Sequence, residues 1–196
     1  MRVVVIGAVA AGTSAAAKAR RNDEDCEIVI YEKDSFISYS GCGMPYYLSG
    51  ELLEKEELYP RDEEFFKKKY NILVKTLHEV LKIDPDKKTL RIKNLKNGEE
   101  FTDYYDKLVI ATGASVAIPN ILGVDRKNVF TFRNINDLNK VLNFINEKKP
   151  KKAAIIGTGY VGLELCESLT KAGLKVSLIS RKPYLTNILD HDLSLY

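Results

Sequence analysis

Two glycine-rich segments, each lying between a short apolar run and a helix-forming stretch, constrain the fold of this chain most. The first apolar run, Arg2-Val3-Val4-Val5-Ile6, is β-branched and leads directly into Gly7, which predicts a buried parallel strand and a tight turn. The turn extends to Gly12 and precedes an alanine-rich helix expected over residues 14–20. Small side chains and free helix N–H groups at such a turn suit the pyrophosphate of a dinucleotide.

The first turn departs from the pattern G-x-G-x-x-G, because Val9 stands at the position of the middle glycine. The motif alone does not separate a nucleotide site from an ordinary strand-to-helix turn, in which glycine serves packing. Glu32 favours the nucleotide site. It ends a second predicted strand, residues 27–32, about 20 residues beyond the turn, where a carboxylate accepts hydrogen bonds from ribose hydroxyls.

The second turn follows the apolar run 153–156 and holds all three glycines, Gly157, Gly159 and Gly162, before a helix expected over residues 163–172. The next predicted strand, 175–179, ends on Ser180-Arg181 instead of an acid. Without a carboxylate there is no repulsion of a ribose 2′-phosphate, and a guanidinium can pair with that phosphate. NADPH is therefore at least as well suited as NADH. The alternative for Arg181 is a solvated surface residue.

The two turns predict an α/β protein with two Rossmann-like βαβ nucleotide-binding folds in a three-layer arrangement, the second fold being incomplete. We expect the first domain at residues 1–113, with a β-rich excursion at 73–102 that includes a hairpin turn at Asn97-Gly98. A crossover is expected at 114–151, and the start of a truncated second domain at 152–196. Helices are expected near residues 62–69 and 135–147.

Cys42 lies between the two folds in the stretch Ser40-Gly41-Cys42-Gly43-Met44-Pro45-Tyr46-Tyr47, with no second cysteine near it in the sequence. The glycine, proline and hydroxyl residues around it are not typical of a hydrophobic core. A thiolate is the reactive form of cysteine, and the positive potential of a nearby helix N-terminus favours it. These residues indicate a one-cysteine redox centre, and the alternative is a small buried apolar side chain.

A third signal is the segment 105–114, a predicted strand that ends in Ala111-Thr112-Gly113, where the backbone comes close to a ligand or a neighbouring strand. In this company the chain resembles the pyridine nucleotide-disulfide oxidoreductases that bind two dinucleotides. Within them it is similar to the single-cysteine branch of coenzyme A disulfide reductases, NADH oxidases and peroxidases, and NAD(P)H-dependent sulfur or polysulfide reductases. The likeness spans nearly the whole chain and rests on the opening turn with Glu32 and on residues 40–47, 78–80, 111–113, 129–134 and 157–164.

The resemblance implies that FAD binds the first domain, with its pyrophosphate at the first turn, its ribose at Glu32 and its adenine near the backbone of Val80. It implies that NADPH or NADH binds the second domain. The residues expected to bind these cofactors are Gly7, Ala8, Ala10, Ala11, Gly12, Glu32, Lys33, Val80, Ala111, Thr112, Gly113, Arg133, Gly157, Gly159, Gly162 and Arg181.

The resemblance assigns catalytic roles to Cys42, Tyr160 and Glu164. The counterpart of Tyr160 shields the flavin until nicotinamide displaces it, and Glu164 corresponds to a residue near the flavin ring. The alternatives are a packing role for Tyr160 and, for Glu164, an acid favoured by the helix dipole. Reduced flavin would then reduce an oxidised Cys42, held either as a mixed disulfide with a small thiol or as a sulfenic acid.

Ala10 separates the sub-branches, because the oxidases and peroxidases of this family usually carry a histidine there. The resemblance therefore favours reduction of a disulfide or sulfur substrate, with coenzyme A disulfide, a persulfide or a polysulfide as acceptor. Two alternatives stay open: an NAD(P)H oxidase that uses a cysteine sulfenic acid, and a non-catalytic nucleotide-binding fragment that needs a partner chain. Cations that could meet the phosphates of coenzyme A are Lys18, Arg20, Arg21 and Arg61, and each is explained equally well as a solvated surface residue.

The composition argues against several other classes of protein. The net charge is only +3, and the lysine clusters lack interleaved aromatics, so nucleic acid is not an expected partner. The two histidines, His78 and His191, stand apart without a cluster of ligand spacing, so no metal site is expected. Three cysteines and no apolar run long enough to cross a bilayer predict a cytoplasmic protein without a membrane partner. The resemblance implies a homodimer for the intact enzyme.

Overall fold

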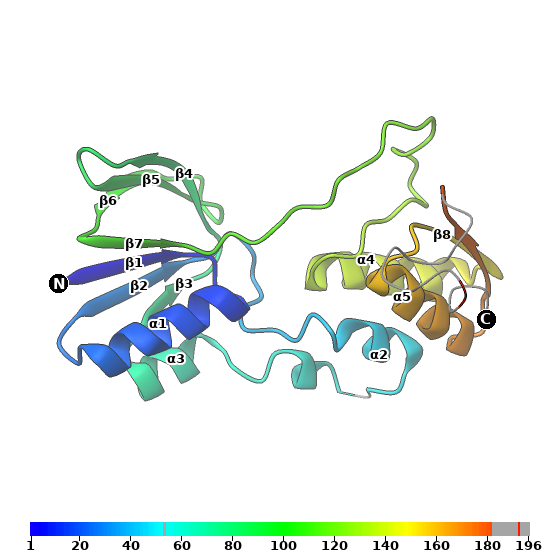
Figure 1. Ribbon diagram of the computed structural model, residues 1–196, viewed down its shortest axis with the longest axis horizontal. Helices are drawn as coiled ribbons and strands as arrows, with labels where there is room; N and C mark the ends of the chain where they lie inside the picture. The colour runs from blue at the N-terminus through cyan, green and yellow to red at the C-terminus, as the bar shows by residue number, and fades with distance from the viewer. Residues whose placement is uncertain (53, 182–191, 193–196) are drawn as a thin grey trace. The chain divides into compact units, whose positions relative to one another are not determined.

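The structure is a computed structural model, and it describes residues 1–52, 54–181 and 192 (Figure 1). The described chain contains both strands and helices, and the strands that bear the two glycine turns pair in parallel with the strands that follow them. The predicted α/β class is therefore confirmed. His191 lies outside the described residues.

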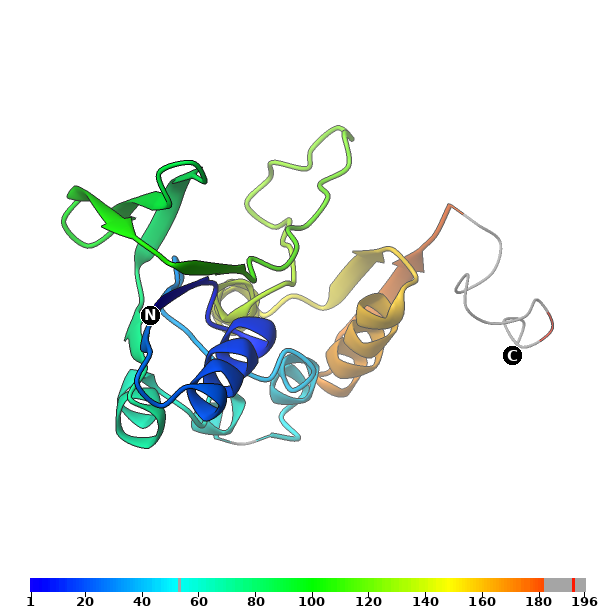
Figure 2. The same cartoon turned by 60° about the vertical axis from the view of Figure 1, so that its left-hand side comes forward.

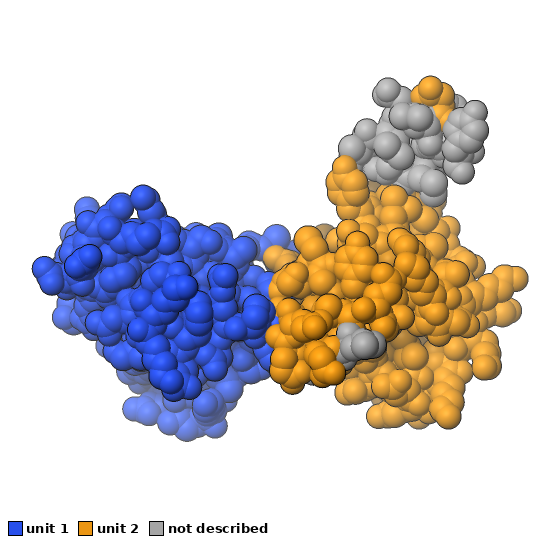
Figure 3. All heavy atoms as spheres, turned by 90° about the horizontal axis from the view of Figure 1, so that it is seen from below, with its two compact units in different colours: residues 1–39, 59–115 blue, residues 40–58, 116–196 orange. Residues whose placement is uncertain are grey.

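The described chain forms two compact units (Figure 3). The first combines residues 1–39 with 59–115, and the second combines residues 40–58 with 116–196. These units differ from the division expected from the sequence, because the segment that carries Cys42 groups with the second unit. The expected domain boundaries stay a prediction.

The first unit has three layers, with a parallel sheet in the middle (Figure 1). The sheet has the order β3-β2-β1-β7 and consists of β1 (Arg2–Ile6), β2 (Glu27–Tyr31), β3 (Leu73–Lys75) and β7 (Lys107–Ile110). Helices α1 (Ala10–Asn22) and α3 (Glu63–Tyr70) lie on one face. The other face is covered by an antiparallel sheet of β4 (His78–Asp84), β5 (Thr89–Asn94) and β6 (Glu100–Tyr104).

Alternation along β1 explains the two cores of this unit, because successive side chains of a strand point to opposite faces. Val5 lies in a buried cluster with Ala16 of α1 and Phe66 of α3. Val4 lies in the other cluster with Leu90 of β5. A strand that is buried on both faces has an uninterrupted apolar sequence, and such a run at residues 2–6 predicts β1.

The β-rich excursion begins later than its expected range, 73–102. Leu73 pairs in parallel with Val29 of β2, so β3 belongs to the central sheet, and the antiparallel excursion runs from His78 to Tyr104. The reason is burial: Ile72 and Val74 are taken into the helix-side core, which holds this short segment against β2. The hairpin turn at Asn97-Gly98 is confirmed between β5 and β6, where Gly98 has a φ of 78°.

The two expected helices outside the glycine turns are confirmed, each with an N-cap that the sequence supplies. The Asp62 side chain accepts a hydrogen bond from the Phe65 N–H at the start of α3. The Asn134 side chain accepts one from the Asp137 N–H at the start of α4 (Ile135–Lys148). Such caps satisfy backbone donors that have no partner within the helix.

The second unit contains a parallel pair, β8 (Lys152–Ile156) and β9 (Lys175–Ile179), connected by α5 (Tyr160–Lys171), which lies along the pair (Figure 2). It also contains α2 (Met44–Ser49) and a short 3-10 helix, η1 (Lys55–Leu58). Helix α2 packs against α5 and α4. An ion pair of 2.5 Å between Lys171 and Glu51 joins the end of α5 to the chain just after α2.

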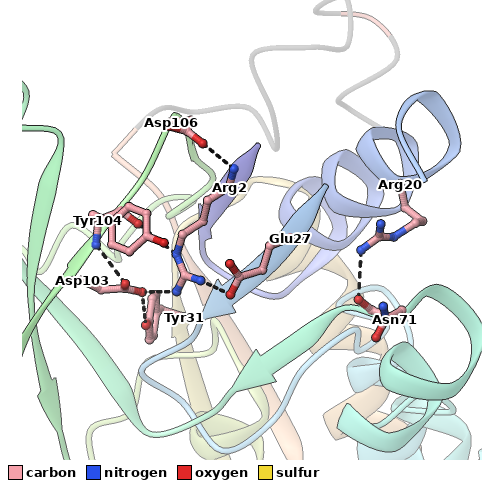
Figure 4. Close-up of polar contacts among 8 residues, drawn as sticks. All are labelled: Arg2, Arg20, Glu27, Tyr31, Asn71, Asp103, Tyr104 and Asp106. Atoms are coloured by element: carbon pink, nitrogen blue, oxygen red, sulfur yellow. Dashed lines mark hydrogen bonds and ion pairs between the residues drawn. The ribbon is translucent and has the colours of Figure 1, made fainter. Parts of the chain in front are cut away.

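A polar cluster joins the two sheets of the first unit at the start of β1 (Figure 4). The Arg2 guanidinium donates to the Asp103 carboxylate at 2.7 Å and forms an ion pair with Glu27. The Tyr31 hydroxyl donates to the same Asp103 oxygen at 2.6 Å, and the Arg2 backbone N–H donates to Asp106 at 2.6 Å. Asp103 of β6 is thereby bonded to both β1 and β2.

The environment of this cluster shifts the protonation equilibria of its members. Burial alone would raise the pKa of the Asp103 carboxyl, but hydrogen bonds from Tyr31 and Arg2 outweigh it and lower that pKa below 3.8. Burial, followed by the hydrogen bond to Asp103, raises the pKa of the Tyr31 phenol above 10.0. The native state therefore favours ionised Asp103 beside neutral Tyr31.

We expect Asp103→Asn to lower the free energy of unfolding by about 2 kcal/mol at pH 7, because the variant loses hydrogen bonds to a charged group. A carboxyl group whose pKa is lowered in the native state stabilises the fold at pH values above its ordinary pKa. This contribution is lost as the pH falls through the native pKa. The difference from the parent should therefore shrink below pH 3.8. Urea unfolding at pH 7 and at pH 3, followed by circular dichroism, measures the difference between the variant and the parent.

The control is Glu100→Gln on the same strand, where the carboxylate is exposed and 3.8 Å from Arg91. Its effect should stay within about 0.5 kcal/mol. An equal loss for Asp103→Asn at pH 7 and at pH 3 would contradict the role of the charge.

Candidate functional site

The first glycine turn is held by backbone contacts at the carboxyl edge of the parallel sheet. The Gly7 N–H donates to the Tyr31 carbonyl at 2.8 Å, and Gly7 has a φ of 102°, a conformation that favours glycine. A Cβ on Gly7 would lie 2.4 Å from the Ala111 oxygen, and a Cβ on Gly12 would lie 1.8 Å from the Gly7 oxygen. Both glycines are therefore required by close packing, and Ala111 lies directly against the turn.

Helix α1 begins at Ala10 with its N-terminal backbone groups available. Val9 occupies the N-cap position and makes no side-chain cap hydrogen bond. The Thr13 N–H donates to the Val9 carbonyl at 3.2 Å. The N–H groups of the first turn before it, at Ala10, Ala11 and Gly12, have no carbonyl within the helix, and such a terminus binds an anion.

Glu32 is brought to this turn by the end of β2 and is only 7% exposed. One of its carboxylate oxygens accepts the Ala8 N–H at 2.7 Å, and the other accepts the Asp34 N–H at 2.9 Å. A carboxylate has about four lone-pair positions, so Glu32 can accept further hydrogen bonds from ribose hydroxyls. The glycine turn, Glu32 and Ala111 together fit the pyrophosphate and ribose of a dinucleotide.

The other residues expected around this first site lie farther along their elements. Thr112 and Gly113 are exposed beyond the end of β7, and Lys33 is exposed directly after Glu32. Val80 is half-buried in β4, beside an irregularity in the pairing with β5, and packs against the apolar cluster under the antiparallel sheet. Arg133 is exposed in the second unit. Their cofactor roles stay predictions.

The second glycine turn repeats the geometry of the first. The Gly157 N–H donates to the Ile179 carbonyl at 2.9 Å, and Gly157 has a φ of 116°. A Cβ on Gly162 would lie 2.2 Å from the Gly157 oxygen, whereas a Cβ on Gly159 would meet no atom within 4 Å. The space beside Gly159, with the uncapped N-terminus of α5 next to it, is a cradle that a pyrophosphate can enter.

The end of β9 places hydroxyl groups where β2 places an acid. The hydroxyls of Thr158 and Ser180 are 3.3 Å apart, and Arg181 follows with an exposed side chain. Tyr160 and Glu164 are four residues apart on α5, so they share one face of the helix. Tyr160 is 65% exposed, and Glu164 is exposed as well.

Cys42 carries an exposed free thiol in a tight turn of the second unit. The Gly43 N–H is within 3.2 Å of both the backbone oxygen and the hydroxyl oxygen of Ser40. Helix α2 begins two residues after the thiol, at Met44, so the helix expected near Cys42 is present. The other two cysteines, Cys26 and Cys166, are buried and half-buried, and both are free.

Arg20, one of the four cations considered for the phosphates of coenzyme A, forms hydrogen bonds within the fold instead. This is a correction to the sequence interpretation. The Arg20 guanidinium donates to the backbone oxygens of Tyr70, Glu24 and Asn71, so it fastens the end of α3 to the end of α1 (Figure 4). Arg21 is exposed and lines a surface hollow together with Lys68 and Lys69. The sequence could not separate these neighbouring arginines, because their contacts are distant in the chain.

Leu58 is a site residue that sequence reasoning missed. It is fully buried beside Gly43, and its carbonyl accepts the Ser40 N–H at 2.7 Å. The residues before it are charged, and no motif marks it.

No group of three or more histidine, cysteine, aspartate or glutamate side chains is placed to hold a metal ion within residues 1–52, 54–181 and 192. Among the described helices, none combines the length and the apolar character needed to cross a bilayer.

The two glycine turns define an α/β protein with two folds of the nucleotide-binding type, and the second unit also carries an exposed free thiol. Comparisons with known proteins agree with this class. The sequence profile of the pyridine nucleotide-disulphide oxidoreductase family matches residues 1–196. The chain belongs to this family.

Individual relatives and solved structures support the same placement. The chain is 38% identical over 193 residues to the coenzyme A disulfide reductase of Staphylococcus haemolyticus, covering 98% of this chain and 43% of that protein. It is 38% identical to an NAD-dependent persulfide reductase from A. fulgidus, with a TM-score of 0.95 over 100% of this chain and 36% of that one. It is 32% identical to the water-forming NADH oxidase from Lactobacillus brevis, with a TM-score of 0.93 over 99% and 43%. The chain thus spans less than half of each.

We expect Gly162→Ala to destabilise the second unit by about 2 kcal/mol, because its Cβ would lie 2.2 Å from a backbone oxygen that cannot move aside. The better helix propensity of alanine, worth about 1 kcal/mol, offsets only part of this loss. Gly159→Ala is the matched variant, because its Cβ meets open space, and the loss of glycine at the N-cap of α5 should lower the free energy of unfolding by no more than about 1 kcal/mol. Urea unfolding of the two variants measures this, and equal stabilities would contradict the packing role of Gly162.

Proposed function

We propose that this chain forms part of a FAD-dependent NAD(P)H oxidoreductase that reduces a disulfide or sulfur substrate through a single redox cysteine, Cys42. The observation that carries the proposal is the pair of glycine turns, with a buried acid at the first and an exposed arginine at the second. Two dinucleotide sites and one exposed thiol are the parts that such a reaction requires. The intact enzyme as a homodimer, and its cytoplasmic location, stay predictions.

The first site suits FAD. Its pyrophosphate would lie on the N–H groups of Ala10, Ala11 and Gly12, and its ribose on Glu32, which is already anchored to the turn through the Ala8 N–H. When bound, the flavin supplies a two-electron relay between nicotinamide and thiol. We assign Ala111, Thr112 and Gly113 to its border, Val80 to its adenine, and Lys33 and Arg133 to its periphery.

The second site suits NADPH or NADH, with the pyrophosphate at Gly157, Gly159 and Gly162. The Ser180 hydroxyl would accept or donate a hydrogen bond at the ribose, and Arg181 would pair with a 2′-phosphate. On α5 we assign Tyr160 to covering the flavin in the absence of nicotinamide, because its aromatic ring is exposed. Glu164, on the same face, would stand near the flavin ring.

Cys42 would act as the nucleophile toward the substrate. Its thiolate attacks one sulfur of a disulfide RSSR, forms a mixed disulfide, and releases RS⁻ as the leaving group. Two electrons and a proton that originate from NADPH and solvent then cleave the mixed disulfide, restoring the Cys42 thiolate and releasing the second RSH. The sum is NADPH, a proton and RSSR giving NADP⁺ and two RSH.

Coenzyme A disulfide is the acceptor that we favour, and a persulfide or polysulfide is the close alternative. Relatives named for coenzyme A disulfide and for persulfide both align over nearly all of this chain. Arg21, Lys68 and Lys69 line a hollow together with Glu24, and this excess of positive charge favours the phosphates of coenzyme A.

The decisive experiment is an anaerobic titration of the purified protein. Its visible spectrum should show bound flavin, NADPH should bleach it, and coenzyme A disulfide or polysulfide should restore it. Restoration by one acceptor identifies the substrate class. A colourless protein that cannot be loaded with FAD would overturn the proposal for this chain and favour a non-catalytic nucleotide-binding fragment.

An NAD(P)H oxidase is the second candidate, because the water-forming NADH oxidase shares the fold at 32% identity. In that case Cys42 would cycle through a sulfenic acid and reduce oxygen. Ala10 argues against it, because a small apolar side chain at the start of α1 can neither donate nor accept a proton. Oxygen uptake with NADPH and no added disulfide tests this candidate.

We expect Cys42→Ser to abolish disulfide-dependent NADPH oxidation while NADPH still bleaches the flavin, because a hydroxyl cannot form a mixed disulfide. Cys166→Ser is the control: this half-buried thiol lies in α5, and the variant should keep the turnover of the parent. Stopped-flow absorbance separates the two half-reactions. Full turnover by Cys42→Ser would show that the thiol has no part in the reaction.

We expect Arg181→Ala to lower kcat/KM for NADPH by about tenfold and to leave kcat/KM for NADH nearly unchanged, because a charge-assisted contact to a 2′-phosphate is lost. Lys175→Ala, an exposed cation at the opposite end of β9, is the matched control. Steady-state kinetics with both nucleotides give the ratio. Equal losses for NADH and NADPH would assign Arg181 to general binding instead of nucleotide choice.

A further inference from the structure

The turn that carries Cys42 is fixed from both sides by one distant residue. Before the cysteine, the Ser40 N–H donates to the Leu58 carbonyl at 2.7 Å. After it, the Leu58 side chain lies against Gly43, where an added Cβ would be 2.9 Å from the Leu58 Cδ2 and 3.1 Å from the Ser40 hydroxyl oxygen. Leu58 is 0% exposed, so its side chain is enclosed by protein.

Cys42 itself contributes little to its own placement. Its side chain is exposed, and a Cβ on its neighbour Gly41 would meet no atom within 4 Å. Since packing around the thiol is absent on that side, its position depends on the backbone of the turn. That backbone is held by the contacts of Ser40 and Gly43 with each other and with Leu58, and it continues into α2 through the Met44 N–H, which donates to the Gly41 carbonyl at 3.4 Å.

We propose that Leu58 and Ser40 are positioning residues for Cys42, acting through the backbone of the turn. Leu58 holds the chain on both sides of the cysteine, and the Ser40 hydroxyl closes the turn by accepting the Gly43 N–H. This inference rests on the proposed role of Cys42 as the redox thiol. A displacement of about 1 Å in such a group can lower a catalysed rate by two orders of magnitude.

The two glycines that flank Cys42 provide a matched pair of variants. Gly43→Ala places a methyl group against Leu58, whereas Gly41→Ala places the same group in open space. The double variant Gly43→Ala/Leu58→Ala removes the clash by shortening the leucine. Ser40→Ala deletes the hydroxyl without changing the packing, and Ser40→Thr restores a hydroxyl at that position.

The rate at which iodoacetamide alkylates Cys42 reports on the turn directly and does not depend on cofactor or substrate. The mass of the peptide that contains Cys42 measures this rate. Across the pH profile, Gly43→Ala should change the alkylation rate by more than about threefold, while Gly41→Ala stays within about twofold of the parent. The double variant should return toward the parent rate. Ser40→Ala should shift the rate in the same direction as Gly43→Ala, and Ser40→Thr should recover it.

Turnover gives the second readout. In the flavin-loaded protein, Gly43→Ala should slow the thiol-dependent half-reaction about tenfold and leave flavin reduction by NADPH unchanged. A double variant that alkylates and turns over no better than Gly43→Ala overturns the role of Leu58. Alkylation that is equal in all variants overturns the inference as a whole. The two proposals can fail separately. If the turn variants shift the alkylation rate but Cys42→Ser keeps full turnover, the positioning role stands and the proposed function is rejected.

Discussion

The approach of the third glycine of each turn to the carbonyl of the first is the contact on which both nucleotide folds depend. A side chain on Gly12 or Gly162 would lie within 2.2 Å of that carbonyl, so each helix is seated directly on the end of its strand. The close seating aims the helix N-terminus at the carboxyl edge of the sheet. The N–H groups and the helix dipole then point to the same place, an arrangement that suits a pyrophosphate.

The two units share this scaffold and differ in the residues that close the second strand. In the first unit the carboxylate of Glu32 is buried and accepts the Ala8 N–H of the turn, which fixes an acceptor for ribose hydroxyls. In the second unit the Thr158 and Ser180 hydroxyls meet instead, and Arg181 follows. A carboxylate repels a 2′-phosphate and a guanidinium attracts it, so this single difference separates the two sites by charge.

The sequence predicts the parts of this fold whose cause is local. The strands β1 and β9 have the expected bounds, because a β-branched run before or after a glycine turn has few other conformations. The short strand β3, the grouping of residues 40–58 with the second unit, and the use of Arg20 by backbone carbonyls were not predicted. Each of these depends on contacts between distant segments, and no local pattern records them. The same holds for Leu58 among the site residues.

A reactive cysteine must be accessible and fixed at the same time, and the segment 40–58 reconciles these requirements. The hydrogen bond from Ser40 to Leu58 joins the two ends of this segment, so the segment forms a loop whose ends lie together. Within the loop α2 packs on α5, and the ion pair between Glu51 and Lys171 adds a second attachment to the same helix. The thiol can therefore stay exposed, because the loop that presents it is ordered by contacts made away from it. The placement of the thiol then depends on the second unit and on the joined ends of the loop, Ser40 and Leu58. It does not depend on side chains that would bury the thiol.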